Sequence, residues 1–344
     1  TADRGDPAMK LAVNGRMDPE HLDFARQLGA TDVVNGVPDC DLAKGYYDFH
    51  DLTLQKSRIE DAGLTWSVLE GVPPEWCDNI KLGLPGRDEQ IENWCRTVEN
   101  MGAVGIPVLG YFFSLRNVGG NYGLRTSKST RSRGGAIVTS FDYAQVKGAR
   151  QDYWYPPIPH DLELSDEDMW NNITYFLKAV IPVAEKAGVR MSLHPDDPPV
   201  SPIGGIARVF RSHAALKRLV DIVPSEYNGL GFCQGTVSEM PGDALDAIRY
   251  FGKRGKINYV HFRFVSNPVP AFSETFIDQG HVDPMESLLA YEEAGVDCPM
   301  IDDHVPRLVL DPDGLHQTSR AYALGYMKAL LDNVGRIGNG KTHS

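Results

Sequence analysis

The segment AGVRMSLH, residues 187–194, holds the pattern that decides the fold. Gly188 suits a left-handed helix C-cap, a short apolar run follows it, and the run ends on His194. Similar runs recur along the chain and alternate with longer segments of helical spacing, which predicts repeated βα units and a parallel sheet. The eight expected strands are Lys10 to Val13, Asp32 to Asn35, Thr65 to Glu70, Pro107 to Phe113, Val189 to His194, Asn228 to Cys233, Ile257 to Arg263 and Pro299 to His304.

The segments between these runs carry apolar residues at helical spacing. Eight strands close a (β/α)₈ barrel, and a chain of 344 residues suffices for one barrel with insertions. We therefore expect a single α/β domain, a TIM barrel, over residues 1–344. The expected helices are 19–29, 87–101, 167–187, 206–220, 241–251, 284–294 and 316–333, with further helical character at 52–62.

A long insertion follows the fourth expected strand. Residues 114–164 are rich in Gly, Ser, Arg and Tyr, and they include the basic stretch RTSKSTRSRGG from Arg125 to Gly135. An insertion at this place lies at the carboxyl face of a barrel, where barrel active sites are built. The composition fits equally a lid over a substrate and a loop whose cations only meet solvent.

Composition excludes several classes of function. The net charge is −12, which argues against a nucleic-acid binder and requires a locally positive site for any anionic substrate. Apolar runs all fall short of the roughly 18 residues of a membrane span. The five cysteines are odd in number and include no CxxC pair, so we expect no disulfide framework and a cytoplasmic location.

Four residues with metal-binding side chains stand at the carboxyl ends of the last four expected strands: His194, Cys233, His261 and Asp303. Strand ends of a closed barrel point toward a common axis, so residues about 30 to 40 positions apart can converge on one ion. Any one of them alone is more often a structural residue, but their joint placement favours a shared metal site. Nitrogen, sulfur and oxygen donors together suit Zn²⁺, Mn²⁺ or Fe²⁺ better than Mg²⁺ or Ca²⁺.

Other polar residues accompany these four. Arg263 could grip a substrate carboxylate through two parallel hydrogen bonds, or it could form a structural salt bridge. His304 could be a general acid or base, since histidine titrates near neutral pH, or it could be a ligand or the structural partner of Asp303. Further candidates are Glu70, Asp196, Asp197, Glu274 and His316, and turn formation before two prolines explains at least one of the paired aspartates.

At these residues the sequence resembles the mannonate dehydratase family, the UxuA type, within the xylose-isomerase-like group of barrels. The likeness covers most of the chain and is most specific in MSLHPDDPP (Met191 to Pro199) and GFCQGT (Gly231 to Thr236). It continues in TWSVLEG from Thr65, NIKLGLPGRDEQIENW from Asn79, VHFR from Val260, the pieces near Glu274 and Asp283, and DDHVP from Asp302.

The resemblance implies a hydro-lyase of hexuronate catabolism that removes water from D-mannonate to give 2-keto-3-deoxy-D-gluconate, and it implies a homodimer. It also implies that the four candidate ligands bind Mn²⁺, with Fe²⁺, Zn²⁺ and Co²⁺ as alternatives. His304 matches the histidine of the family's Asp-His pair, and Arg263 matches the arginine that would hold the carboxylate. His316 is the third catalytic candidate, because it lies close to Thr318, where the family has a tyrosine.

Several positions depart from the family pattern. Phe112 and Phe264 stand where asparagine is usual, Ser273 stands where histidine is usual, and Thr318 replaces the tyrosine. All four candidate ligands are kept, so the ion is expected to remain while the pocket around the sugar has changed. Two alternatives therefore stay open: a related metal-dependent dehydratase, isomerase or epimerase for another sugar derivative, and an inactive homologue that keeps the metal and binds sugar.

Overall fold

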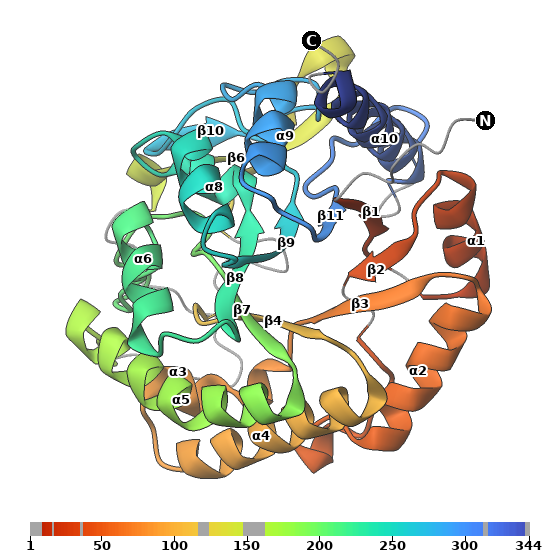
Figure 1. The fold of residues 1–344 in the computed structure, drawn as a ribbon. Helices are drawn as coiled ribbons and strands as arrows, with labels where there is room; N and C mark the ends of the chain where they lie inside the picture. The colour runs from red at the N-terminus through yellow and green to blue at the C-terminus, as the bar shows by residue number, and fades with distance from the viewer. Residues whose placement is uncertain are drawn as a thin grey trace.

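Eight parallel strands close into a barrel in the computed structural model, which describes residues 9–15, 17–34, 37–115, 124–146, 162–311 and 316–340 (Figure 1). Neighbours in the chain pair with one another, and β11 closes the ring against β1. The predicted α/β barrel is therefore confirmed. Its strands are β1 (Lys10–Val13), β2 (Asp32–Val34), β3 (Thr65–Glu70), β4 (Val108–Phe112), β7 (Arg190–His194), β8 (Asn228–Cys233), β9 (Ile257–His261) and β11 (Pro299–Ile301).

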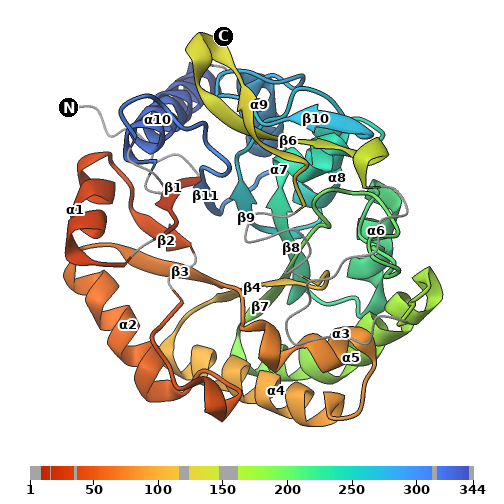
Figure 2. The ribbon, with the colours of Figure 1, turned by 180° about the vertical axis from the view of Figure 1, so that it is seen from behind.

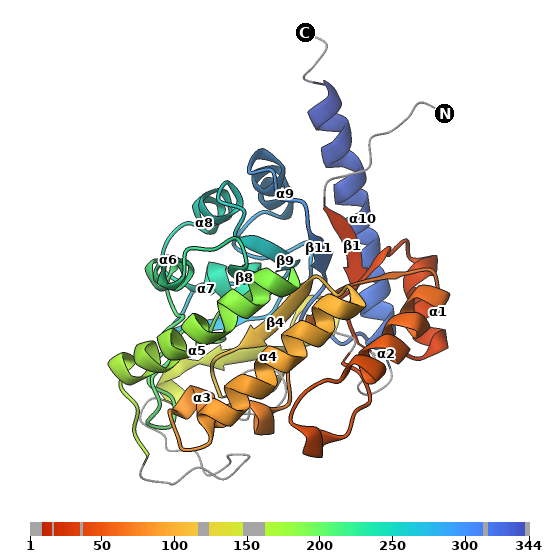
Figure 3. The ribbon, with the colours of Figure 1, turned by 60° about the horizontal axis from the view of Figure 1, so that its bottom comes forward.

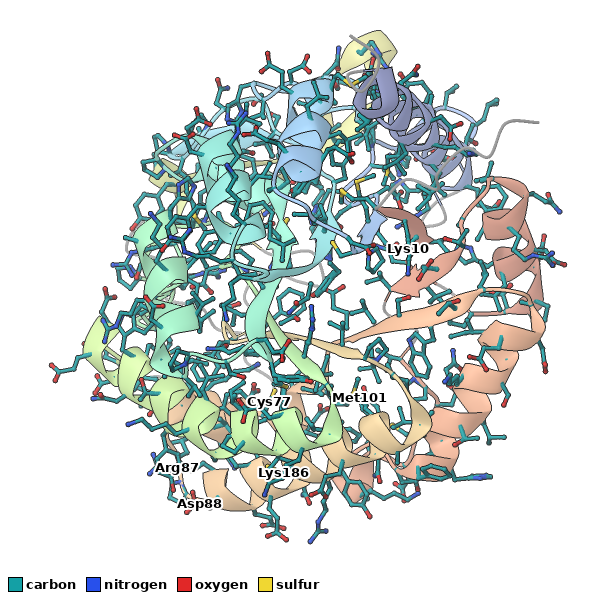
Figure 4. The ribbon with its side chains drawn as sticks, in the orientation of Figure 1. Lys10, Cys77, Arg87, Asp88, Met101 and Lys186 are labelled. Atoms are coloured by element: carbon teal, nitrogen blue, oxygen red, sulfur yellow. The ribbon has the colours of Figure 1, made fainter. Side chains whose placement is uncertain are left out.

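Helices surround the barrel (Figure 1). Asp88 and Lys186 lie on the outer surface of this ring, whereas Met101 is buried (Figure 4). Helix α10 lies beside β1 and extends past the ring (Figure 3). Among the described helices, none is both long and apolar enough to cross a membrane. The helices are α1 (Pro19–Gln27), α2 (Phe49–Asp61), α3 (Asp78–Leu82), α4 (Arg87–Val104), α5 (Asp166–Ala187), α6 (His213–Ile222), α7 (Gln234–Glu239), α8 (Ala244–Gly252), α9 (Pro284–Glu293) and α10 (Gln317–Gly340).

Capping residues set where the helices begin and end. Ser165 and Asp168 form a capping box at the start of α5, and Gly188 ends that helix with φ 69°. The helix expected at 206–220 is displaced: α6 begins only after Ser212, whose side chain accepts a hydrogen bond from the Ala215 amide. The apolar residues that suggested an earlier start are buried in extended chain.

The last two barrel strands end earlier than expected. Strand β9 ends at His261 and β11 ends at Ile301. Arg263 and Asp303 therefore lie on the loops that follow the strands, where their side chains do not have to alternate across the sheet. His304 has φ 50°, in the left-handed region that residues other than glycine seldom occupy.

Small side chains and one tyrosine fill the barrel interior. Tyr259 is fully buried and packs with Ala12, Val34, Val68, Val108 and Ile301. Its hydroxyl donates a 2.8 Å hydrogen bond to Glu70. A Cβ at Gly231 would lie 2.3 Å from the Tyr259 oxygen, and one at Gly110 would lie 2.4 Å from it, so the ring fits only because both positions are glycine.

Replacing Gly231 with alanine is expected to lower the free energy of unfolding by about 1–3 kcal/mol, because the new methyl group would displace the Tyr259 ring. Urea denaturation followed by circular dichroism measures the change. The matched control is Gly325→Ala in α10, where a Cβ meets nothing within 4 Å. There we expect unchanged stability or a gain of up to about 1 kcal/mol. A Gly231→Ala protein as stable as the wild type would contradict this packing.

The described part of the insertion forms an antiparallel sheet at the end of the barrel nearer the viewer in Figure 2. Strands β5 (Ser127–Arg131) and β6 (Ile137–Asp142) pair with each other, and β6 also pairs with β10 (Ala271–Ser273). Because β10 belongs to the loop after β9, two separate βα loops build this sheet. Residues 116–123 and 147–161 of the predicted insertion lie outside the described residues.

Candidate metal centre and active site

Three of the four expected ligands meet at the carboxyl ends of neighbouring strands. One ligand atom from each of His194, Cys233 and His261 lies within 4.8 Å of the other two, and all three side chains are buried. Each residue is the last of its strand, in β7, β8 and β9. The register places Cys233 directly beside His261. The closed barrel thus assembles a metal-ligand cluster without any local spacing motif.

Two contacts orient the His194 ring. Its Nδ1 lies 2.7 Å from the carbonyl oxygen of Pro195, so a proton on Nδ1 donates to that oxygen and leaves Nε2 as the ligand atom. The Phe112 ring lies against the imidazole, with 4.6 Å between the ring centroids. His194 is therefore held in the tautomer that a metal ligand needs.

The His261 ring shows that the cluster fits a cation. Both of its ring nitrogens are buried and have no well-directed hydrogen bond among the described residues, although Glu70 Oε1 lies 3.1 Å from Nε2. Leaving a buried polar atom unpaired costs about 1–3 kcal/mol, and a bound metal ion removes that cost. Burial alone would lower the pKa of His261, but Glu70, Asp303 and Cys233 raise it well above the usual value. The charges that attract a proton here also attract a cation.

The surroundings of Cys233 favour its thiolate form. Burial alone would raise the pKa of its thiol, but His194, His261 and the cationic Arg263 lower this pKa well below the usual value. The Thr236 hydroxyl donates to the sulfur at 3.2 Å, and Arg263 Nη1 lies 3.7 Å from it. Since the thiolate is the form that ligates metals, this environment suits a ligand.

Asp303, the fourth expected ligand, lies next to the three-residue cluster. Its Oδ2 is 3.5 Å from His261 Nδ1 and 3.5 Å from His304 Nε2. Burial alone would raise the pKa of Asp303, but His304, His261 and Arg263 lower it well below the usual value. A carboxylate therefore stands at the edge of the cluster. On its other side, His304 places Nδ1 3.4 Å from Glu274, so its ring lies between two carboxylates.

The sequence left two roles open for Arg263, a grip on a substrate carboxylate and a structural salt bridge. Its side chain is 1% exposed, and its Nε and Nη2 donate to Glu274 at 2.7 Å. The remaining N–H groups donate to Asp197 at 2.8 Å, to Thr236 and to Glu239. All five donors are thus used within the protein, which leaves none for the bidentate grip on a substrate carboxylate. The geometry is that of the other interpretation, a structural salt bridge.

His316 is not a member of the metal-ligand cluster. It precedes α10 with φ 51°, and its carbonyl oxygen accepts hydrogen bonds from Ser319 and Arg320. Burial lowers the pKa of its ring, with Asp311 acting in the opposite direction. Nothing among the described contacts connects this ring to the cluster, so its catalytic role stays a prediction.

One of the four departures from the family pattern touches a candidate ligand. That residue is Phe112, which packs on His194. Phe264 packs edge-on against Phe262, and Ser273 pairs with Ser140 in the inserted sheet. The Thr318 amide donates to Asp311 at 2.7 Å. Of the four positions that depart from the family pattern, Phe112 is therefore the one that the described contacts place next to the cluster.

The site also contains three residues that the sequence pattern did not indicate, Glu239, Tyr259 and Arg125, whereas Glu70 was already a candidate. Glu239 is fully buried against Arg263, and Tyr259 donates to Glu70. Burial alone would raise the pKa of Glu70, but His261, His194 and Tyr259 lower it to about 2. Arg125, known from the sequence only as part of a basic stretch, is buried among the acids around Arg263. No local signal marks these residues, because their partners are remote in the chain.

A (β/α)₈ barrel whose strand ends gather two histidines, a cysteine and carboxylates defines the class: a barrel protein with a candidate transition-metal site. Within this class, the chain belongs to the D-mannonate dehydratase (UxuA) family, whose pattern matches residues 8–340.

Known proteins support this assignment. Mannonate dehydratase 2 of Halalkalibacterium halodurans is 30% identical over 323 residues, which cover 86% of this chain and 90% of the relative. The crystal structure of mannonate dehydratase from Streptococcus suis serotype 2 superposes with a TM-score of 0.83 at 28% identity, covering 96% of both chains. A xylose isomerase domain protein from Planctomyces limnophilus shares the fold alone, with a TM-score of 0.61 at 13% identity over 96% of this chain and 99% of that one.

Proposed function

We propose that this protein is a D-mannonate dehydratase that uses a divalent ion, Mn²⁺ in the first place, held by His194, Cys233, His261 and Asp303. The observation that carries the proposal is the convergence of the first three ligands, with the Asp303 carboxylate 3.5 Å from His261. Fe²⁺, Zn²⁺ and Co²⁺ fit the same donor atoms. When bound, the ion supplies a Lewis acid that stabilises negative charge developing on the substrate carboxylate and C2 hydroxyl oxygens.

The protein's own groups handle the protons. Removal of water from D-mannonate takes a weakly acidic proton from C2, beside the carboxylate, and gives a proton to the hydroxyl that leaves C3. His304 is our choice for a proton acceptor or donor, because its ring reaches the edge of the cluster beside Asp303. The carboxylates of Asp303 and Glu274 flank the two ring nitrogens, so they orient the ring.

The wild-type protein is expected to convert D-mannonate into a 2-keto-3-deoxy acid when Mn²⁺ is present. The assay scores formation of the keto acid, and the control is the same protein stripped of metal, which should form none. Absence of product from protein that has bound Mn²⁺ would reject D-mannonate as the substrate. Product that forms equally well without metal would reject the metal-dependent mechanism.

Phe112 favours a second candidate, a metal-dependent lyase or isomerase for another sugar derivative. The family usually has a polar asparagine at this position, whereas the aromatic ring here covers one face of His194. A less polar wall beside the ion suits a substrate with fewer hydroxyl groups or another configuration. A parallel screen of aldonic acids and ketoses tests this candidate, which gains support if another compound gives a higher kcat/KM than D-mannonate.

We further propose a cytoplasmic homodimer. Cys40, Cys77, Cys95, Cys233 and Cys298 are all free in the structure, and free thiols persist in a reducing compartment. The dimer is proposed from family membership alone.

A further inference from the structure

Arg125 is a buried cation that the insertion places among the acids of the site. Its side chain is 1% exposed. It binds Asp197 through two parallel hydrogen bonds of 2.8 and 2.9 Å, and it binds Glu274 Oε1 through Nη2 at 2.8 Å and Nε at 3.2 Å. The ring of Phe272 lies 5.1 Å from the guanidinium carbon. Such a forked, charge-assisted arrangement fixes both carboxylates in position.

The same two carboxylates also bind Arg263. Asp197 Oδ2 accepts from both arginines, and so does Glu274 Oε1. Burial alone would raise the pKa of Asp197, but Arg125 and Arg263 together lower it below the usual value. Two guanidinium groups thus share two buried carboxylates, and each arginine depends on the other for the balance of charge.

The contacts continue from Arg263 to the metal-ligand cluster. Arg263 Nη1 lies 3.7 Å from Cys233 Sγ and 3.3 Å from Thr236, whose hydroxyl also donates to that sulfur. Glu274 lies 3.4 Å from His304. A continuous set of charged contacts therefore runs from the insertion to a candidate metal ligand and to the candidate acid or base.

We propose that Arg125 is a positioning residue of the metal centre: it holds Asp197 and Glu274 against Arg263 and thereby fixes the Cys233 thiolate. The proposal rests on the proposed metal site, and it makes the insertion part of the active site. If Arg125 were removed, three acids would share Arg263 alone: Asp197, Glu274 and Glu239. The excess of buried negative charge would then draw the guanidinium away from the sulfur.

Cobalt binding tests this proposal without any substrate. Co²⁺ replaces Mn²⁺ as a probe, because a thiolate bound to Co²⁺ gives a charge-transfer absorption band that reports Cys233 directly. In Arg125→Ala we expect Co²⁺ affinity to fall by about 10- to 100-fold, the usual effect of removing a residue that orients a ligand. The band should also shift or weaken. Arg125→Lys keeps the charge but lacks the fork, so we expect an intermediate affinity.

Arg133 offers a matched control on the same insertion. It binds Asp278 at 2.6 Å and stacks on Phe276 at 3.9 Å, but its side chain is 41% exposed and none of its described contacts is with the buried acids. Arg133→Ala should therefore keep the Co²⁺ affinity and the band of the wild type, while thermal unfolding shows whether each variant is folded. Equal loss of affinity in both arginine variants would overturn the proposal, because a weakened attachment of the inserted sheet would then explain the loss in both. Unchanged affinity in Arg125→Ala would overturn it as well.

Exogenous guanidinium separates this proposal from the proposed function. Guanidinium ion at millimolar concentration should restore at least part of the Co²⁺ band in Arg125→Ala and leave Arg133→Ala unchanged, because it can occupy the space between Asp197 and Glu274. If the wild type binds Co²⁺ but does not dehydrate D-mannonate, the proposed substrate fails while the cobalt results still decide the role of Arg125. Failure of guanidinium to restore any of the band would count against that role.

Discussion

Alanine in place of His194 is expected to abolish both metal binding and turnover. His194 contributes a buried ring nitrogen whose direction is fixed by the 2.7 Å contact of Nδ1 with the Pro195 carbonyl. An alanine leaves three of the four proposed ligands, Cys233, His261 and Asp303, so retention of the ion falls with the ligand number. Metal content after dialysis, measured by elemental analysis, and keto-acid formation are the two readouts.

Asp303→Ala is the companion variant, and it tests a ligand that lies 3.5 Å from the cluster instead of within it. It too should lose the ion and the activity. His50→Ala, on the exposed surface of α2, removes a histidine elsewhere and should keep both. Circular dichroism on each variant distinguishes loss of the ion from loss of the fold. Full metal retention in both His194→Ala and Asp303→Ala would refute the proposed ligand set.

Replacing His304 with asparagine is expected to keep the ion and to lower kcat by about 10²- to 10⁴-fold, the usual contribution of a general acid or base. Asparagine tolerates the left-handed backbone at this position, where φ is 50°, so the loop can keep its shape. The amide still reaches polar neighbours, but it cannot exchange a proton with the substrate. Steady-state kinetics on D-mannonate with added Mn²⁺ measure kcat and KM.

A histidine outside the cluster controls for the loss of an imidazole. His281 lies on the loop after β10, and its Nδ1 is 2.9 Å from the carbonyl oxygen of Val265. His281→Asn should keep kcat close to that of the wild type, because His281 lies outside the cluster and its described contacts do not include the groups that handle protons. An undiminished rate in His304→Asn would reject the acid or base role of that residue.

Regular alternation made the barrel predictable. The strands at Lys10–Val13, Thr65–Glu70 and Asn228–Cys233 have the predicted bounds, because turn residues or polar residues flank their buried runs. The start of α6 was harder to predict from the sequence. The residues before Ser212 are as apolar as a helix face, although they lie outside the helix. Tertiary burial, which the local sequence does not contain, decided that segment.

The meeting of three candidate metal ligands could be predicted because parallel strands bring their carboxyl ends to one place. His194, Cys233 and His261 are each the last residue of a strand, so their positions followed from the topology. The role of Arg263 could not be predicted in the same way. Its partner Asp197 comes from the loop after β7 and its partner Glu239 ends helix α7, and only the folded structure shows that its five donors are all used.

The inserted sheet can be completed only after much of the barrel has been synthesised. Strand β6 obtains its second partner, β10, only after many intervening barrel residues have been made, and Arg125 and its partner Glu274 are 149 residues apart. At about 5–20 residues per second on the ribosome, the hairpin of β5 and β6 waits on the order of ten seconds with one edge unpaired. Strand β6, whose edge waits for β10, contains Thr139, Ser140 and Asp142, and polar residues on a strand edge resist pairing with the wrong chain. The inserted sheet is therefore complete only once β10 has been made, and α9, β11 and α10 follow it in the chain.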